Sequence, residues 1–285
     1  MGKTSAPESV EVVRRDIRFD VDTADLRSWH PEGLHVAHFF NALSIFFPEG
    51  EKFFIDSVRH YRDRIDSPAL QRDVKGFVGQ EAMHSREHRR YNAALERMGL
   101  PIAELEGRVK DHLETVCGRT SPQEQLAVTI ALEHFTAIMA HVLLSDERLL
   151  TNADPGMAAI WRWHAVEETE HKAVAFDVYR EVGGSEGMRR ATMWITHALF
   201  VLETGLWTLI SLSLDPEARS DPRRVARSFW RLRRSPFASP AAIRQLLEYT
   251  RKGFHPNDRN TTGLIAEWRQ RLFGSDGQLT DLLAS

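Results

Sequence analysis

The chain carries one cysteine among its 285 residues, Cys117. A single thiol cannot form an internal disulfide, and it cannot supply a cysteine-based zinc or iron–sulfur site. Strong charge of one sign is also missing, since the formal net charge is −3. This near balance argues against a dedicated nucleic-acid or polyanion binder. The one basic run, Arg223 to Arg234, is interpreted as a solvated helix face, with a site for an anionic partner as the alternative.

An apolar signal segment is likewise lacking from the first residues, MGKTSAPESVEVVRRD. Secretory signal peptides have an apolar core of several residues near the N-terminus. The expected location is therefore the cytoplasm.

No segment alternates apolar and polar residues over the length of a strand, and no repeat of fixed period is present. Helical periodicity begins at Leu34 instead, which predicts an all-α protein. We expect a ferritin-like helical bundle with additional C-terminal helices. Residues 1–30 would form an N-terminal arm, either lying along the body or partly loose, and residues 31–285 a single all-helical di-metal domain. Within it, the ligand-bearing core is placed at about 45–183 and the covering helices at about 185–275.

Serine, aspartate and proline mark several helix starts, because a capping side chain followed by proline suits the first turn. Pro48 is interpreted as interrupting one helix and opening the next. The other expected helices run from Ser67-Pro68 to Met98, from Ser121-Pro122 to about Leu150, from Asp154-Pro155 to Gly183-Gly184, and from about Glu186 to Leu214.

One long apolar run, residues 193–214, needs separate treatment because it could span a bilayer. His197 and Glu203 interrupt it, and a glutamate in mid-membrane is costly. We therefore expect a helix buried inside the bundle, rather than a membrane contact. A weaker hypothesis is that Gly205, Trp207 and the leucines line an apolar substrate channel.

The sequence WRWHAVEETEHKAV contains His164, Glu168 and His171 at i, i+4 and i+7. At about 100° per residue these side chains share an arc of roughly 60° on one helical face. Glu167 and Glu170 point away from that arc, so their substitution would serve as a control. The pair Glu168-x-x-His171 has the i, i+3 spacing that di-metal carboxylate bundles direct into their cores.

A second face of this kind lies in GQEAMHSREH, where Glu81, His84 and His88 are spaced i, i+3, i+7. Di-metal bundles need two Glu-x-x-His pairs and one further glutamate from each of two other helices. Glu51, with Glu49 as its rival, and Glu133 supply those glutamates. Four carboxylates would neutralise two divalent cations. The predicted metal ligands are Glu51, Glu81, His84, Glu133, Glu168 and His171, with His164 as a seventh.

Several neighbouring polar side chains are left outside this set. His88 is expected to hydrogen-bond a ligand, or simply to pack in the core, rather than to bind metal directly. Tyr91 extends the same helical face and is a weaker candidate for such a supporting role. His35 and His38 could approach the site, but surface or loop positions suit them as well.

The segments FFPEGEKFF, GQEAMHSREHRRYN, ALEHFTA and WHAVEETEHKAVAFDVY resemble the bacterial family called predicted metal-dependent hydrolases, over roughly residues 15–265. That resemblance implies a metal-dependent protein of ferritin-like character. The ligand pattern is also similar to that of di-iron arylamine N-oxygenases, which use a Glu, an E-x-x-H, a Glu and an H-x-x-x-E-x-x-H. This second similarity supports His164 as a ligand, and it has no counterpart for His88.

Ligand chemistry suggests three functions. An O₂-activating di-iron oxidoreductase, or oxygenase, is preferred, because carboxylate-rich sites suit iron or manganese. It would hold two Fe ions, with Mn possible, and would need a small or apolar substrate, O₂ and an unknown electron donor. The alternative is a metal-dependent hydrolase using a metal-activated water, and a third option is non-enzymatic iron binding. A homodimer would suit an amphipathic bundle of this size.

Overall fold

The computed structural model describes residues 10–22, 24–223, 225–227 and 236–283, and these confirm the all-α prediction. Within them the only β-type pairing is an isolated bridge between Ile17 and Leu283. Part of the basic run Arg223 to Arg234 lies outside the described residues. The helices are α1 (Leu34–Arg59), α2 (Pro68–Arg97), α3 (Ile102–Arg119), α4 (Pro122–Ser145), α5 (Pro155–His171), α6 (Val174–Glu181), α7 (Glu186–Leu214), α8 (Pro216–Ser220), α10 (Pro240–Glu248) and α11 (Thr262–Phe273).

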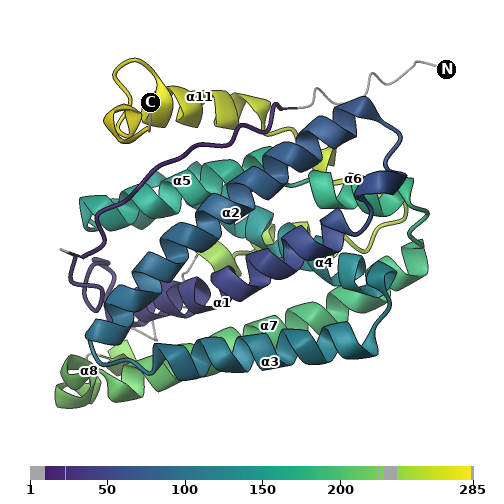
Figure 1. The fold of residues 1–285 in the computed structure, drawn as a ribbon. Helices are drawn as coiled ribbons and strands as arrows, with labels where there is room; N and C mark the ends of the chain where they lie inside the picture. Colours follow the sequence, from purple (N-terminus) through teal and green to yellow (C-terminus); the bar gives the residue numbers. More distant parts are fainter. Residues whose placement is uncertain (1–9, 23, 224, 228–235, 284–285) are drawn as a thin grey trace.

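The bundle is built around α1, α2, α4 and α5 (Figure 1). Helix α1 packs on α2, α3, α4 and α7, and α4 packs on α5, α6 and α7. Helices α3 and α7 both lie along one edge, where His112 of α3 pairs with Glu203 of α7, whereas α11 covers α5 at the opposite edge. The interior between α1, α2, α4 and α5 is thereby closed from several sides.

Three predicted helix starts are confirmed by their caps. Ser67 accepts a hydrogen bond from the backbone N–H of Leu70, and Asp154 accepts one from Met157. Ser121 and Glu124 form a reciprocal capping box. Each cap satisfies N–H groups that the first turn leaves without a helical partner.

The predicted interruption at Pro48 is wrong, because α1 continues through it from Leu34 to Arg59. Proline removes the hydrogen bond that its N–H would give to the carbonyl four residues earlier, which is Ser44. Here the amide of Asn92, on α2, donates to the Ser44 carbonyl oxygen at 3.0 Å. A neighbouring helix thus replaces the lost bond, a contact that local sequence cannot reveal.

Two other helix ends differ from prediction. Helix α4 ends at Ser145, and a 3₁₀ turn over Glu147–Leu150 follows it. The helix expected to run to Gly183 is divided at Lys172–Ala173 into α5 and α6. At this break the Lys172 ammonium donates to the Arg259 carbonyl and the Thr261 hydroxyl, at 2.8 and 2.9 Å.

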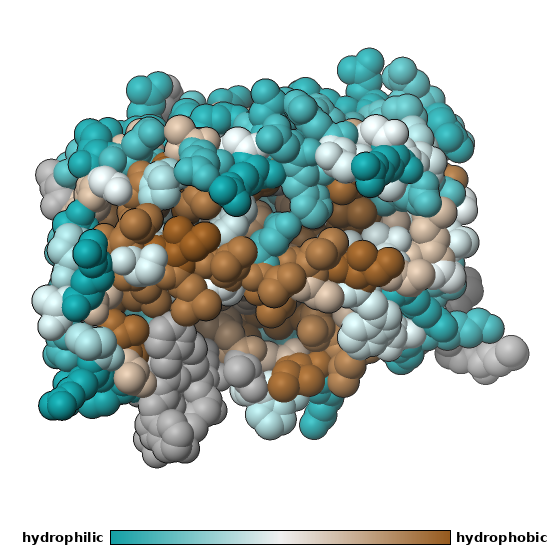
Figure 2. Space-filling model, turned by 90° about the horizontal axis from the view of Figure 1, so that it is seen from below, coloured by the Kyte–Doolittle hydropathy of each residue, from teal (hydrophilic) through white to brown (hydrophobic). Residues whose placement is uncertain are grey.

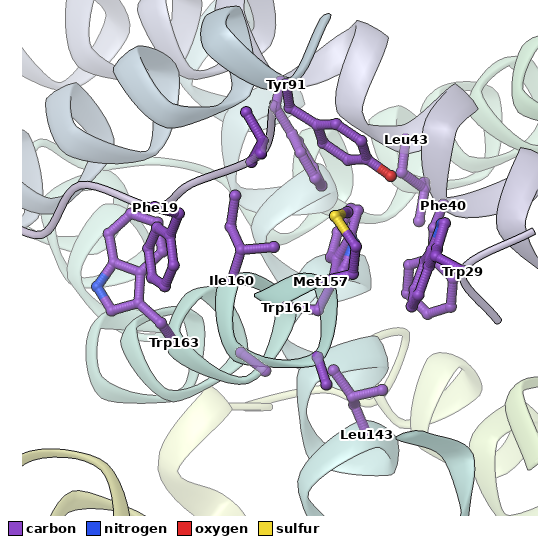
Figure 3. Close-up of a cluster of buried hydrophobic side chains, with 14 of the residues drawn as sticks. Phe19, Trp29, Phe40, Leu43, Tyr91, Leu143, Met157, Ile160, Trp161 and Trp163 are labelled. Atoms are coloured by element: carbon purple, nitrogen blue, oxygen red, sulfur yellow. The ribbon is translucent and has the colours of Figure 1, made fainter. Parts of the chain in front are cut away.

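The described part of the N-terminal arm, residues 10–22 and 24–30, lies along the body of the protein. Figure 1 shows it running past α2 and α11, and the side chains of Ile17, Phe19 and Val21 are buried. Gly76 on α2 permits this close passage, since a Cβ there would lie 2.5 Å from the Val12 carbonyl oxygen. In Figure 3 the Phe19 ring meets Trp163, so the arm contributes to the aromatic core beside α5.

The prediction that residues 193–214 are buried inside the bundle is wrong. Helix α7 buries one side against α1 and α4, but Ile195, Leu202 and Leu206 are 64%, 67% and 50% exposed. By length and composition, α4 and α7 are the two described helices that could cross a membrane, and half of the apolar segment of α4 is buried against a third for α7. The apolar residues of α7 surround the helix, so packing one face leaves the rest exposed.

Candidate metal centre

The seven predicted ligands are all buried, and they come together from α1, α2, α4 and α5. Glu168 lies among the three histidines: its Oε1 is 3.0 Å from Nε2 of His164 and 3.6 Å from Nε2 of His171. The same oxygen is 3.6 Å from Nδ1 of His84. The i, i+4, i+7 face of α5 therefore points at the Glu-x-x-His face of α2.

Ligand atoms from different helices are close enough to share cations. Nε2 of His171 lies 3.2 Å from Glu81 and 3.5 Å from Glu133. Four groups of three side chains each have ligand atoms within 4.8 Å of one another. These groups are Glu81–Glu168–His171, Glu51–Glu81–His84, His84–His164–Glu168 and Glu51–His88–His164.

Many of these ligand atoms are buried without a hydrogen-bond partner. They are Oε1 of Glu51, both oxygens of Glu81, both oxygens of Glu133, Oε2 of Glu168, Nδ1 of His84 and Nε2 of His171. A buried polar atom without a partner costs free energy, and such atoms are rare in folded proteins. These unpaired atoms belong to six of the seven predicted ligands, all but His164, and they face one another, so the residues present fit bound cations.

The charge of the site supports the same fit. Burial, together with the neighbouring carboxylates, holds the pKa values of Glu51, Glu81 and Glu133 well above the usual range. Burial lowers the pKa of His84 to about 3 and that of His164 to about 4, which leaves neutral imidazoles. Neutral imidazoles are the form that ligates metal, and the glutamates would ligate as carboxylates once a cation displaces their protons.

A buried salt bridge orients His84. Nε2 of His84 is 3.1 Å from Glu167, whose other oxygen accepts from the guanidinium of Arg15 at 3.0 Å. Burial raises the pKa of Glu167 to about 8, with Arg15 acting in the opposite direction. With Nε2–H donating to Glu167, the free lone pair of His84 is on Nδ1, the nitrogen that faces Glu81 and Glu168.

His171 is held in a corresponding way through Gln80. Nδ1 of His171 lies 2.9 Å from the Gln80 side-chain oxygen, and the Gln80 amide donates to Glu170 at 2.7 Å. Glu170 accepts in turn from Arg15 and Arg269, at 2.7 and 2.6 Å. Because the amide oxygen accepts only, Nδ1 of His171 carries the proton and Nε2 is left for a cation.

A third chain of hydrogen bonds fixes His164. The Ser44 hydroxyl donates to Asn92 at 2.7 Å, so its oxygen accepts from Nδ1 of His88 at 2.9 Å. Nε2 of His88 then accepts from Nδ1 of His164 at 2.7 Å, which leaves Nε2 of His164 facing Glu168. This arrangement satisfies every group with one proton each. It favours His88 as a partner of His164 rather than as a ligand.

The remaining candidates lie apart from the ligand atoms. The hydroxyl of Tyr91 donates to Asn41 at 2.5 Å rather than to a site residue. His38 pairs with Asp215 at 3.2 Å. Glu51 is buried and accepts from Ser85 at 2.9 Å, whereas Glu49 is only half-buried. The geometry therefore favours Glu51 over Glu49.

Glu167 and Glu170 are not neutral surface positions, although the retention of metal by their variants stays a prediction. Both point away from the metal-facing arc of α5, yet both are buried and paired with Arg15. Glu167 contacts His84 of α2, and Glu170 holds the Gln80 side chain that contacts His171. The sequence could have indicated that Glu167 and Glu170 are buried, because histidine, tryptophan and glutamate side chains occur on every face of α5 and such a helix needs neighbours on all sides. It could not have indicated the roles of Arg15 and Gln80, since an arginine in a polar arm and a glutamine on a helix are ordinary surface residues.

An apolar pocket of about 320 Å³ reaches the centre from the edge of the bundle. Phe47 and Phe54 of α1, Leu113 of α3, Leu132 of α4 and Phe200 of α7 line it, and Glu51 is among the lining residues. At the same pocket, His112 of α3 pairs with Glu203 of α7 at 3.0 Å. An apolar molecule in this pocket would touch a candidate metal ligand.

A family model described as predicted metal-dependent hydrolase matches residues 13–260. The match spans all seven candidate ligands and Arg15. No curated protein matches the chain, and no solved structure does either.

Proposed function

Because this chain belongs to the predicted metal-dependent hydrolase family, we propose that it is a hydrolase that depends on two divalent cations. The observation that carries the proposal is the cluster of buried, unpaired carboxylate and imidazole atoms at the inner end of an apolar pocket. The description of the family favours this activity over the oxygenase preferred from ligand chemistry alone. The cations would be held by Glu51, Glu81, His84, Glu133, His164, Glu168 and His171.

Paired divalent cations, when bound, lower the pKa of water and polarise an ester or phosphate oxygen. The protein orients the ligand side chains and excludes water from the site. Arg15, through Glu167, and Gln80 hold the rings of His84 and His171, so the nitrogens that face the centre do not need to reorganise. Ser85 holds one oxygen of Glu51, which leaves the other oxygen for a cation.

The lining of the pocket limits the substrate class. Leucine, valine and phenylalanine side chains dominate it, so the group that occupies the pocket would be apolar. We propose an ester or phosphoester whose apolar part lies between α3 and α7 and whose scissile bond lies near Glu51.

Oxygen chemistry is the second candidate, and one observation favours it. Every proposed ligand is on a helix, and four of the seven are glutamates. Carboxylate-rich helical sites of this type suit iron or manganese. Under this alternative the same pocket would hold an apolar substrate for oxidation.

The deciding experiment begins with elemental analysis of protein purified without a metal-chelating tag. We expect about two divalent cations per chain, a stoichiometry typical of such bundles. Hydrolysis of nitrophenyl esters and phosphoesters with apolar chains of increasing length would then be assayed without oxygen. Anaerobic turnover supports the hydrolase, whereas substrate-dependent oxygen consumption supports the second candidate.

The matched variants are Glu51→Gln and Glu49→Gln, which make the same change two residues apart. Glu51→Gln should lower the metal content and hydrolysis, and Glu49→Gln should leave both unchanged. Protein that holds no metal and takes up none on loading would refute both candidate functions.

A further inference from the structure

Helix α7 presents an uninterrupted apolar face to solvent. The residues of this α7 face are Trp194, Ile195, Leu199, Val201, Leu202, Leu206 and Leu209, each at least 41% exposed. Figure 2 looks onto this side of the molecule and shows an apolar band across it, bordered by hydrophilic side chains. Patches of this extent are uncommon on soluble monomers and mark interaction surfaces.

The opposite side of α7 is anchored to the bundle. The ring of Trp207 stacks on Phe46 of α1 at 4.0 Å, and Phe200 meets Phe135 of α4 at 5.0 Å. Polar groups such as Thr204 and Ser211 are buried on this side. A helix held in this way can lie on an apolar phase with one face, whereas crossing a bilayer would require it to leave these contacts.

The α7 face is continuous with the apolar pocket. Ile195 and Leu199 belong to the face and also line the pocket, which extends inward to Glu51. A molecule dissolved in whatever covers the face could therefore reach the metal centre through a pocket with a largely apolar lining.

Arginines flank the face at both ends. Arg190 lies at its beginning, and Arg219, Arg223 and Arg227 are exposed just beyond its end. Residues 215–234 of the sequence contain seven arginines and three acidic residues. Between Thr192 and Leu214 the only acidic residue is Glu203, which pairs with His112.

We propose that the α7 face docks on a lipid bilayer containing anionic lipids, and that the pocket receives the apolar chain of its substrate directly from that bilayer. An apolar helical face flanked by basic residues is the form of a helix that lies in a membrane interface. A second copy of this chain is the weaker occupant. In an antiparallel pairing, Arg190 of one chain would approach the arginines beyond α7 of the other, which would repel them.

The docking part of this proposal is independent of the metal centre, and the uptake of substrate rests on the proposed function. Docked through α7, the molecule would direct the pocket mouth toward the acyl layer. The substrate class is then a lipid-soluble ester or phosphoester with a long hydrocarbon chain, rather than a water-soluble ester.

Flotation with vesicles of phosphatidylcholine, with and without phosphatidylglycerol, tests the docking. The full chain should float with the anionic vesicles, and high salt should weaken its binding. Leu202→Glu should reduce the bound fraction about ten-fold or more, because it places a charge at the centre of the apolar face. Leu282→Glu is the matched control, since Leu282 is 44% exposed and lies in the C-terminal turn, where the next residue, Leu283, pairs with Ile17 of the arm and not with α7. It should bind as the wild type does.

Light scattering in the absence of lipid measures whether the chain is a monomer or a dimer, and so tests whether a second copy covers the α7 face. A monomer that floats with vesicles supports the proposal. A dimer that Leu202→Glu dissociates, combined with no flotation, would overturn it, and so would equal flotation of wild type and Leu202→Glu. Circular dichroism and metal content should be the same for both, which excludes misfolding as the cause.

Glu168→Gln separates this inference from the proposed function. This variant should lose metal yet still float, because docking does not need the metal centre. If the wild type held no metal, the proposed hydrolase would be refuted, but docking would not be. Leu132→Trp, which fills the pocket, should still float but should lose binding of a fluorescent fatty acid. Unchanged fatty-acid binding would overturn the uptake part alone.

Discussion

The two sides of α5 bury carboxylates in opposite ways. On the outer side, Glu167 and Glu170 are paired with Arg15 and Arg269 at 2.6 to 3.0 Å. On the inner side, the carboxylates are Glu51, Glu81, Glu133 and Glu168, and no lysine or arginine among the described residues lies within 4.0 Å of their oxygens. The same chain thus supplies cationic partners to one cluster and omits them from the other.

This difference indicates what the inner cluster is built to hold. Buried carboxylates need compensating charge, and guanidinium groups provide it well where the protein can place them. On the inner side the protein places imidazole nitrogens instead, aimed inward by hydrogen bonds on their far side. Glu51, Glu81 and Glu133 would then be ionised with bound cations, whereas their raised pKa values favour the protonated form in metal-free protein.

The largest expected effect is on the outer cluster. Arg15→Met should lower the free energy of unfolding of metal-free protein by about 3–5 kcal/mol, because it leaves Glu167 and Glu170 buried without their guanidinium partner. Urea unfolding would measure it. Arg14→Met, at an exposed ion pair with Asp16, should cost less than about 1 kcal/mol. Equal losses of unfolding free energy in the two variants would mean that Arg15 does not stabilise the protein mainly by pairing with Glu167 and Glu170.

Two glutamine variants, one in each cluster, test whether the outer carboxylates are paired and the inner ones are not. In metal-free protein Glu170→Gln should cost about 2–3 kcal/mol, since it weakens bonds to Arg15, Arg269 and Gln80. Glu133→Gln should cost less than about 1 kcal/mol, because both oxygens of Glu133 lack partners and a neutral amide replaces them. Elemental analysis should show the reverse ranking, with more metal lost from Glu133→Gln.

Cation binding should affect the inner cluster alone. At a free metal concentration 100 times the dissociation constant, the free energy of unfolding should rise by about 2.7 kcal/mol per site. Thermal unfolding against Mn²⁺ or Zn²⁺ concentration would measure it in wild type and Glu168→Gln. A smaller rise in the variant supports the assignment of Glu168. An equal rise in both would place the bound cation elsewhere.

Sequence reasoning identified the residues whose spacing carries the information. The i, i+4, i+7 pattern of His164, Glu168 and His171 placed them on one helical face, and the structure brings that face against Glu81 and His84. Ligation itself stays a prediction, as does the ferritin-like character of the bundle. Periodicity also found the helices, since caps such as Ser67 and Ser121 are local signals.

What sequence reasoning missed depends on contacts between distant segments. Asn92 replaces the bond lost at Pro48, and Arg15 crosses from the arm to α5, over separations of 48 and 152 residues from Ser44 and Glu167. The exposure of α7 was missed for another reason. An apolar helix interrupted only by residues such as His197 and Glu203 has the same composition whether a core or a lipid surface covers it.

The smallest expected effect is the pH dependence of the free energy of unfolding that is due to His30 in the N-terminal arm. Burial lowers the pKa of His30 to about 4, where its Nε2 donates to the Leu149 carbonyl and its Nδ1 accepts from Glu32 N–H. Below the unfolded pKa of about 6.5 the unfolded chain takes a proton that the folded chain refuses, so stability falls as pH falls toward 4.

Between pH 7 and pH 5 the loss due to His30 should be about 2 kcal/mol. The inner glutamates of metal-free protein act with the opposite sign, because their raised pKa values favour folding as pH falls. The difference between wild type and His30→Gln, followed by urea unfolding at each pH, isolates the histidine. A difference that does not change with pH would show that the arm is anchored without help from the neutral imidazole of His30.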